Sequence, residues 1–259
     1  MAATRFLLAG SVLFVWDRMR GAPMPTLPQW RSGAIIGGLL LVIGNGGVTW
    51  AEKEIPSGVT ALLISTSPIW FVILDWLAFD GPRPSRRVVL GLAVGLSGVL
   101  LLIGPDRILT GGGFSLAGIL VLMIATISWA AGSLYSRRAI LPASPLMATA
   151  VEMLAGGMIL LVVSTVAGEP FAFDPSQVSL VSLLALGYLF LFGSLVGFTA
   201  YVWLLRVSTP ARVSTYAYVN PVIAVVLGWT LGGEEMTGRM ILAAGVIIAG
   251  VVLIVMRKQ

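Results

Sequence analysis

The side chains that could bind a solute are polar residues placed inside long apolar segments. Asn45, Thr49 and Glu52 recur at i, i+4 and i+7 of one such segment, a spacing that puts them on one face of a helix. In lipid, a polar side chain costs free energy unless it faces a partner or a wet cavity. The stripe is therefore typical of a helix that lines a polar path through a membrane.

Similar stripes occur in three further apolar segments. Tyr216 and Asn220 share one helical face, Trp129 leads a stripe that continues through serines, and Tyr201 shares a segment with Ser194. Aromatic walls with few fixed charges suit flat, amphipathic or zwitterionic solutes.

Glu152 is an isolated acidic residue in the interior of an apolar segment, and no basic residue shares that interior. A low-dielectric environment favours the protonated form of such a carboxyl group, so Glu152 is a candidate for proton coupling. Glu52, at the outer end of the Asn45 stripe, is the second candidate. The alternative is a structural role, in which a neutral Glu152 carboxyl is hydrogen-bonded to a neighbouring helix.

Pro68 and Pro221 lie inside apolar segments and predict interrupted helices. Each proline removes a backbone hydrogen bond, which frees the carbonyls of Ile64 and Ala217. Nearby serine, threonine, tyrosine and asparagine side chains could replace the lost donors. Two interpretations follow and are compatible: polar residues that repair kinks, and a pair of hinges beside a central cavity.

The composition defines the class of protein. The chain has 259 residues, of which 58% are hydrophobic and 10% charged, against about 45–50% and about 25% in soluble domains. We expect an all-α polytopic membrane protein whose nine transmembrane helices cover residues 4–17, 32–51, 57–79, 87–104, 114–135, 145–167, 178–205, 211–232 and 239–256. Glycine pairs such as Gly33/Gly37 and Gly91/Gly95 predict close helix packing.

The same composition excludes several functions. The chain has no cysteine and no histidine, and it contains no phosphate loop, catalytic triad or metal-ligand cluster, so we expect no cofactor, no metal and no catalytic residue. Its net charge of +5 is no sign of nucleic-acid binding. In a membrane protein, the placement of the basic residues mostly encodes orientation. Alternating loops place twelve basic residues on one side and four on the other. The first side should be cytoplasmic, with the C-terminus.

The chain contains an internal duplication. Residues 50–76 recur as residues 203–229, 153 positions later, and Pro68 then matches Pro221. The matched spans cross the membrane in opposite directions, which predicts two inverted five-helix repeats, residues 1–104 and 114–256. The first repeat shows four of its five helices, because AATRFLLAG at the start resembles ATAVEMLAG in the second helix of the other repeat. We expect an upstream first helix or a shortened chain.

These features resemble a known family. The inverted repeat and the segments GNGGVTWAE, SWAAGSLYSRR, AVEMLAGG and STYAYVNPVIAVVLGWTLGGE are similar to the drug/metabolite transporter superfamily, and within it to EamA-type exporters of the YedA-like branch. The resemblance implies export of metabolites or drugs across a bacterial plasma (inner) membrane. It also implies a central substrate cavity, which we place on Asn45, Thr49, Trp129, Tyr201, Tyr216 and Asn220.

The sequence therefore favours a secondary transporter that works by alternating access. Because no ATP-binding element is present, we expect the driving force to be an ion or proton gradient, or the solute gradient itself. The expected partners are membrane lipid and a small solute, either an amino-acid-like metabolite or an amphipathic drug. A second copy of the chain is a further candidate partner. The alternative is a non-transporting fragment or assembly partner of such a carrier. An intramembrane enzyme is disfavoured, because its site would need clustered histidine, cysteine or acidic residues.

Overall fold

The structure, a computed structural model, describes residues 2–55, 57–103, 115–169, 178–231 and 237–255. Every regular element in these residues is a helix, and helices fall on all nine predicted spans. The all-α prediction is therefore confirmed. Five helical stretches are long and apolar enough to cross a membrane by length and composition: Leu27–Ala51, Leu116–Ser136, Pro145–Val166, Leu180–Val207 and Gly238–Val255.

Four of the predicted spans consist of several helical pieces, and two of these pieces are π-helical. The elements are α1 (Ala2–Met19), α2 (Leu27–Gly37), π-helical η1 (Gly38–Gly46), α3 (Gly47–Ala51), α4 (Ser57–Ile64), α5 (Ser67–Ala78), α6 (Arg86–Ile103), α8 (Leu116–Ser136), α9 (Pro145–Val166), α10 (Leu180–Tyr188), π-helical η4 (Leu189–Phe198), α11 (Thr199–Val207), α12 (Pro210–Val213), α13 (Tyr216–Leu231) and α14 (Gly238–Val255). The sequence also predicts a flexible turn at Gly111 to Gly113 and an acidic connection that begins at Gly168; the turn and most of the connection lie outside the described residues.

The second span begins five residues earlier than its hydropathy predicts. Its first turn starts at Leu27, where a capping box is formed by Thr26 and Gln29. The Thr26 N–H donates to Gln29 Oε1 over 2.8 Å, and Pro28 lies in the first turn, where a missing N–H costs little. Local capping therefore sets this end of the helix.

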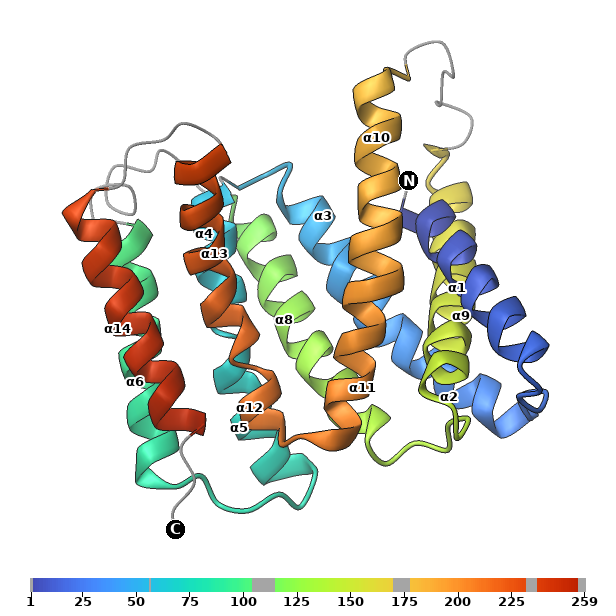
Figure 1. Cartoon of the computed structure of the whole chain (residues 1–259), viewed down its shortest axis with the longest axis horizontal. Coiled ribbons are helices and arrows are strands. Elements are labelled where there is room, and N and C mark those ends of the chain that lie inside the picture. The colour runs from blue at the N-terminus through green and yellow to red at the C-terminus, as the bar shows by residue number, and fades with distance from the viewer. Residues whose placement is uncertain (1, 56, 104–114, 170–177, 232–236, 256–259) are drawn as a thin grey trace. The chain divides into compact units, whose positions relative to one another are not determined.

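Helix packing divides the chain into two compact units. Unit 1 contains Met1–Gly46 and Tyr135–Val207, and unit 2 contains Gly47–Leu134 and Ser208–Gln259. Each unit combines segments of both predicted repeats. Helices that the duplication relates pack side by side, α1 with α9 in unit 1 and α6 with α14 in unit 2 (Figure 1).

Unit 1 is assembled around α9, which packs against α1, α2 and η1. Helices α1 and α9 are antiparallel, because Gly157 lies against Leu7 while Gly10 lies against Leu154. The contact between α2 and α9 is closer still. A Cβ atom added at Gly37 would lie 2.5 Å from the backbone oxygen of Glu152 and 2.7 Å from the Gly156 nitrogen. Only glycine permits this approach, as the Gly33/Gly37 pair predicts.

Unit 2 repeats the same kind of contact between α6 and α14. A Cβ atom at Gly250 would lie 2.5 Å from the Gly95 nitrogen, and one at Gly91 would lie 2.9 Å from the Gly250 oxygen. A fully buried tyrosine on α13, Tyr218, joins this pair by donating its hydroxyl to the Leu92 oxygen over 3.2 Å. One buried cluster of the unit consists of Leu92, Val99, Tyr218, Ile247 and Ile254.

Candidate functional site

The candidate site begins with two spans that change helix type midway. The span Leu27–Ala51 becomes π-helical at η1, and the span Leu180–Val207 becomes π-helical at η4. The 153-residue duplication relates Gly38–Gly46 to residues 191–199, so the two π-helical segments occupy nearly equivalent positions. π-helical turns are rare in proteins, and those that occur are often found at functional sites. Sequence reasoning missed both, since hydropathy is insensitive to the hydrogen-bond register inside an apolar helix.

Arg5 on α1 lies close to both π-helical segments. Its Nη2 atom donates to Asn45 Oδ1 on η1 over 3.4 Å. A Cβ atom at Gly193 on η4 would lie 3.7 Å from Arg5 Nη1. The guanidinium also lies 4.4 Å from the centroid of the Phe6 ring, and its buried Nε atom has no hydrogen-bond partner within the described ranges.

Arg5 is a candidate site residue that is not among the cavity residues predicted from the sequence. In the sequence it counts as one of the four basic residues on the side opposite the C-terminus. A basic residue followed by FLLAG, inside an apolar segment, is itself a signal, because intramembrane cations are usually paired or functional. The structure places that cation beside Asn45, the most deeply placed residue of the predicted polar stripe.

The predicted cavity residues fall in both units. Asn45 and Tyr201 belong to unit 1, where buried Tyr201 packs on Phe198 with ring centroids 6.3 Å apart. The other four belong to unit 2: Thr49 on α3, Trp129 on α8, and Tyr216 and Asn220 on α13. The cavity as a whole therefore stays a prediction.

The third span is interrupted where Pro68 predicts. Helix α4 ends at Ile64 and α5 begins at Ser67. The freed carbonyl of Ile64 accepts a hydrogen bond from Ser67 Oγ over 2.5 Å, and that of Ala217 accepts one from Ser65 Oγ over 3.3 Å. Serine hydroxyls from one span thus repair both proline sites, so the kink-repair interpretation holds for these two residues.

The eighth span is interrupted elsewhere. Helix α13 continues through Pro221, and the break lies at Ser214 and Thr215, between α12 and α13. Ser214 Oγ donates to the Ala211 oxygen over 3.0 Å, and Thr215 Oγ1 donates to the Arg212 oxygen over 2.7 Å. These short-range bonds compete with helix continuation, whereas the Ser65 hydroxyl, which donates to the Ala217 carbonyl, lets α13 continue past Pro221.

Glu152 is fully buried in α9. Neither carboxyl oxygen has a hydrogen-bond partner within the described residues. The charged residues on the elements packed against α9 are Arg5, Asp17 and Arg18 on α1, Arg31 on α2 and Arg206 on α11, and Arg20 lies in the turn directly after α1. Arg206 is the one that interacts electrostatically with Glu152. It also donates to the backbone oxygens of Ala143, over 3.1 Å, and Pro142, over 3.2 Å. Glu52 is exposed in the turn after α3.

The described residues thus form a helical membrane protein with an arginine–asparagine contact beside paired π-helical segments and a separate buried carboxyl group. Among them, no group of three acidic, histidine or cysteine residues is placed to hold a metal ion.

Comparison with known proteins gives the family. The EamA-like transporter family matches residues 1–104 and 116–256. The uncharacterized inner membrane transporter YedA of Escherichia coli is 42% identical over 259 residues, which cover 100% of this chain and 81% of that protein. The chain therefore belongs to the EamA-like transporter family, which confirms the resemblance found in its sequence.

A more distant relative and a solved structure are also similar to this chain over most of its length. Protein PecM of Dickeya dadantii is 26% identical over 258 residues, covering 98% of this chain and 81% of that protein. A solved crystal structure aligns with a TM-score of 0.75 at 21% identity, covering 98% of this chain and 86% of the other, and it supports the fold. The protein is thus a multi-helix membrane transporter, and its cargo is a small molecule.

Proposed function

We propose that the protein exports small organic solutes across the bacterial inner membrane by alternating access, driven by a proton or another ion gradient. The observation that carries this proposal is the pair of π-helical segments, η1 and η4, at nearly equivalent positions of the duplication. Two related segments of irregular backbone give a carrier two matching places at which to bend.

The Arg5–Asn45 contact supports a binding role for the same region. A guanidinium has five N–H donors, and the hydrogen bond to Asn45 uses one of them at a long distance of 3.4 Å. Such a group is ready to receive a polar part of a solute. The substrate class we propose is an amino-acid-like metabolite or an amphipathic drug, and Thr49, Trp129, Tyr201, Tyr216 and Asn220 remain the other predicted cavity residues.

The proposed orientation places the C-terminus in the cytoplasm, because twelve of the sixteen basic residues fall on that side. The connection that contains Arg137 and Arg138 then faces the cytoplasm, and the turn that contains Lys53 faces outside. The inner-membrane assignment follows the relative in Escherichia coli, whose name gives that location.

Two-sided access to the cavity is the first expected result. A single cysteine replacing Asn45 should react with a membrane-impermeant maleimide from the outside in cells and from the inside in inverted vesicles. The parental chain has no cysteine that would interfere. Two exposed positions serve as one-sided controls: Lys53→Cys should react only from outside and Ile140→Cys only from inside. Labelling of Asn45→Cys from one side alone would contradict alternating access, and reversed controls would overturn the orientation.

The second expected result concerns Pro68. Replacing Pro68 with alanine restores an N–H that can bond to the Ile64 carbonyl, which straightens the break between α4 and α5. We expect the ratio of outside to inside labelling at Asn45→Cys to change about tenfold, the effect of a shift of roughly 1.4 kcal/mol between two states. Pro221→Ala should give a smaller change, because α13 is continuous there. The exposed Pro23→Ala is the control, and equal ratios in all three variants would make both prolines packing features only.

A further inference from the structure

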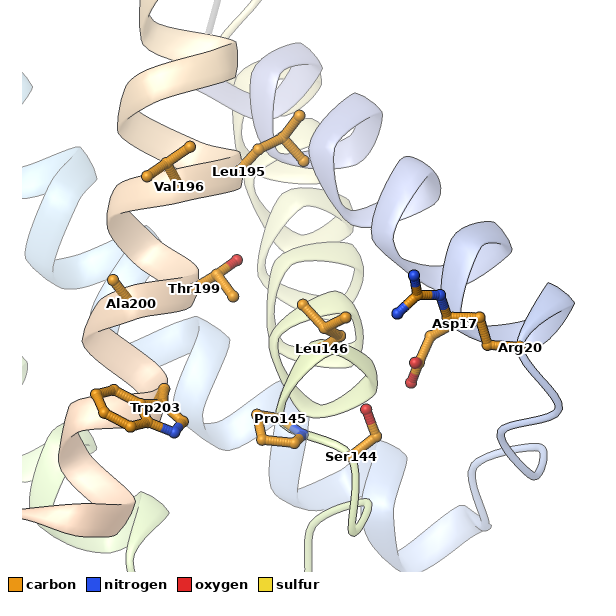
Figure 2. Close-up of a pocket in the computed structure, with 10 residues that line it drawn as sticks. All are labelled: Asp17, Arg20, Ser144, Pro145, Leu146, Leu195, Val196, Thr199, Ala200 and Trp203. Carbon is orange, nitrogen blue, oxygen red and sulfur yellow. The ribbon is translucent and has the colours of Figure 1, made fainter.

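A cavity of about 640 Å³ opens in unit 1, away from Arg5 and Asn45. Figure 2 shows it between the last turns of α1, the first turn of α9 and the helix formed by η4 and α11. Its lining residues are Asp17, Arg20, Ser144, Pro145, Leu146, Leu195, Val196, Thr199, Ala200 and Trp203. Its volume lies within the range of about 300–1,000 Å³ that is usual for small-molecule sites.

The cavity contains a buried acid that lacks a donor. Asp17 is 6% exposed, and its Oδ2 atom has no hydrogen-bond partner within the described residues. Two residues of the first turn of α9 do not supply the missing donor: Pro145 has no N–H, and the Met147 N–H is donated to Ser144 Oγ. A buried carboxylate oxygen without a donor is costly. A ligand that brings an N–H donor would remove that cost.

The cavity also contains a base. Arg20 lines it one helical turn after Asp17, with its guanidinium 4.8 Å from the centroid of the Trp16 ring. A simple cation would be repelled by Arg20 and a simple anion by Asp17. The pair therefore selects a zwitterion whose positive group carries N–H donors and whose negative group accepts from a guanidinium.

The lining changes from polar to apolar along its length. Asp17, Arg20 and Ser144 lie at one end, beside the first turn of α9, and Leu195 and Val196 lie at the other (Figure 2). Between residues 195 and 203 the helix advances by about 12 Å. The wall is open to the side, since Val196 is 57% and Trp203 is 50% exposed. An amphipathic ligand with its head at the helix ends and its tail along η4 fits this gradient.

We propose that this cavity binds a membrane phospholipid whose headgroup has a primary ammonium, with the ammonium on Asp17, the phosphate on Arg20 and one acyl chain along Leu195 and Val196. A primary ammonium offers three N–H donors, whereas the trimethylammonium of a choline lipid has the same charge and no N–H. The site therefore prefers phosphatidylethanolamine over phosphatidylcholine. Lipid binding here goes beyond the proposed transport and does not depend on which solute is carried.

The test uses the full chain in nanodiscs with equal amounts of palmitoyl-oleoyl phosphatidylethanolamine, phosphatidylcholine and phosphatidylglycerol, and counts retained lipids by native mass spectrometry. The parental protein should retain the ethanolamine lipid about tenfold over the choline lipid, the effect expected of one charge-assisted hydrogen bond. Asp17→Asn should lower that preference several-fold, while the exposed Glu169→Gln, which removes the same charge elsewhere, should keep it. Equal retention of both lipids by the parental protein, or an undiminished preference in Asp17→Asn, would overturn the proposal.

Two further variants keep the test decisive if Asp17→Asn folds poorly. Arg20→Gln should weaken retention of both the ethanolamine and the choline lipid, whereas Arg18→Gln, on an exposed arginine outside the cavity, should not. Ala200→Trp should fill the cavity and exclude both lipids. Unchanged retention of both lipids in this variant would contradict lipid binding in this cavity. Displacement of the retained lipid by millimolar soluble phosphoethanolamine would assign the cavity to a free zwitterion and overturn the proposal that a phospholipid binds there.

Discussion

Replacing Gly37 with leucine should remove nearly all correctly folded protein. An added Cβ atom would lie 2.5 Å from the Glu152 oxygen, 2.7 Å from the Gly156 nitrogen and 2.9 Å from the Gly156 Cα atom. All three are backbone atoms, which cannot move aside as a side chain can. Helices α2 and α9 would have to separate, and α9 is the element against which α1, α2 and η1 pack.

The size of the effect can be bounded. Overpacking by a few methylene groups costs about 1–3 kcal/mol where side chains can adjust, so a backbone clash should exceed the upper end of that range. We expect the monodisperse fraction in size-exclusion chromatography of a fluorescent fusion to fall at least about tenfold, since each 1.4 kcal/mol is a factor of ten. Gly37→Ala should give a smaller loss in the same direction.

The neighbouring residue provides the matched control. A Cβ atom at Gly38 would meet nothing within 4 Å, so Gly38→Leu should leave the monodisperse fraction close to that of the parental protein. If Gly37→Leu and Gly38→Leu behave alike, the close contact between α2 and α9 is absent from the folded protein.

The second large effect is expected for Glu152→Gln. Glutamine copies the size and hydrogen bonding of a protonated carboxyl group but cannot release a proton. If Glu152 carries the coupled proton, the variant should lose transport that is driven uphill by a pH gradient and retain solute exchange at equal pH. The measurement compares gradient-driven flux and counterflow in proteoliposomes, with parental and variant protein side by side.

Two controls separate coupling from a structural role. Glu52→Gln changes the other candidate carboxyl group, which is exposed after α3, and should leave both activities unchanged. Glu152→Leu should lower the folded yield if the carboxyl group has a partner to satisfy. Undiminished uphill transport by Glu152→Gln removes this residue from the mechanism, and loss of uphill transport in Glu52→Gln transfers the coupling role there.

Most of the helical architecture could be predicted from the sequence, because a chain in lipid must satisfy its backbone groups within each span. Within the described residues, a helix falls on each of the nine ranges that hydropathy predicts, and the Gly33/Gly37 spacing predicts the closest helix contact of unit 1. Pro68 predicts the break in the third span. These features depend on local composition or on single residues with one strong steric effect.

The remaining features depend on which helices become neighbours. Arg206 interacts with Glu152 from another helix, and the hydroxyl that reaches the Ala217 carbonyl comes from Ser65, far away in the chain. That donor is one reason why Pro221 leaves α13 unbroken. The π-helical segments and the position of Arg5 beside Asn45 follow from packing in the same way, and the hydropathy of the sequence does not show which helices pack together.

The central claim is that the protein is a secondary carrier of small solutes. The most direct test loads parental protein into proteoliposomes, imposes a pH gradient and follows a panel of radiolabelled amino acids and amphipathic cations. We expect at least one solute to exchange in counterflow at equal pH and to accumulate above equilibrium with the gradient, with accumulation abolished by a protonophore. A protein that folds, binds to the liposomes and moves no panel solute faster than protein-free liposomes would contradict the claim.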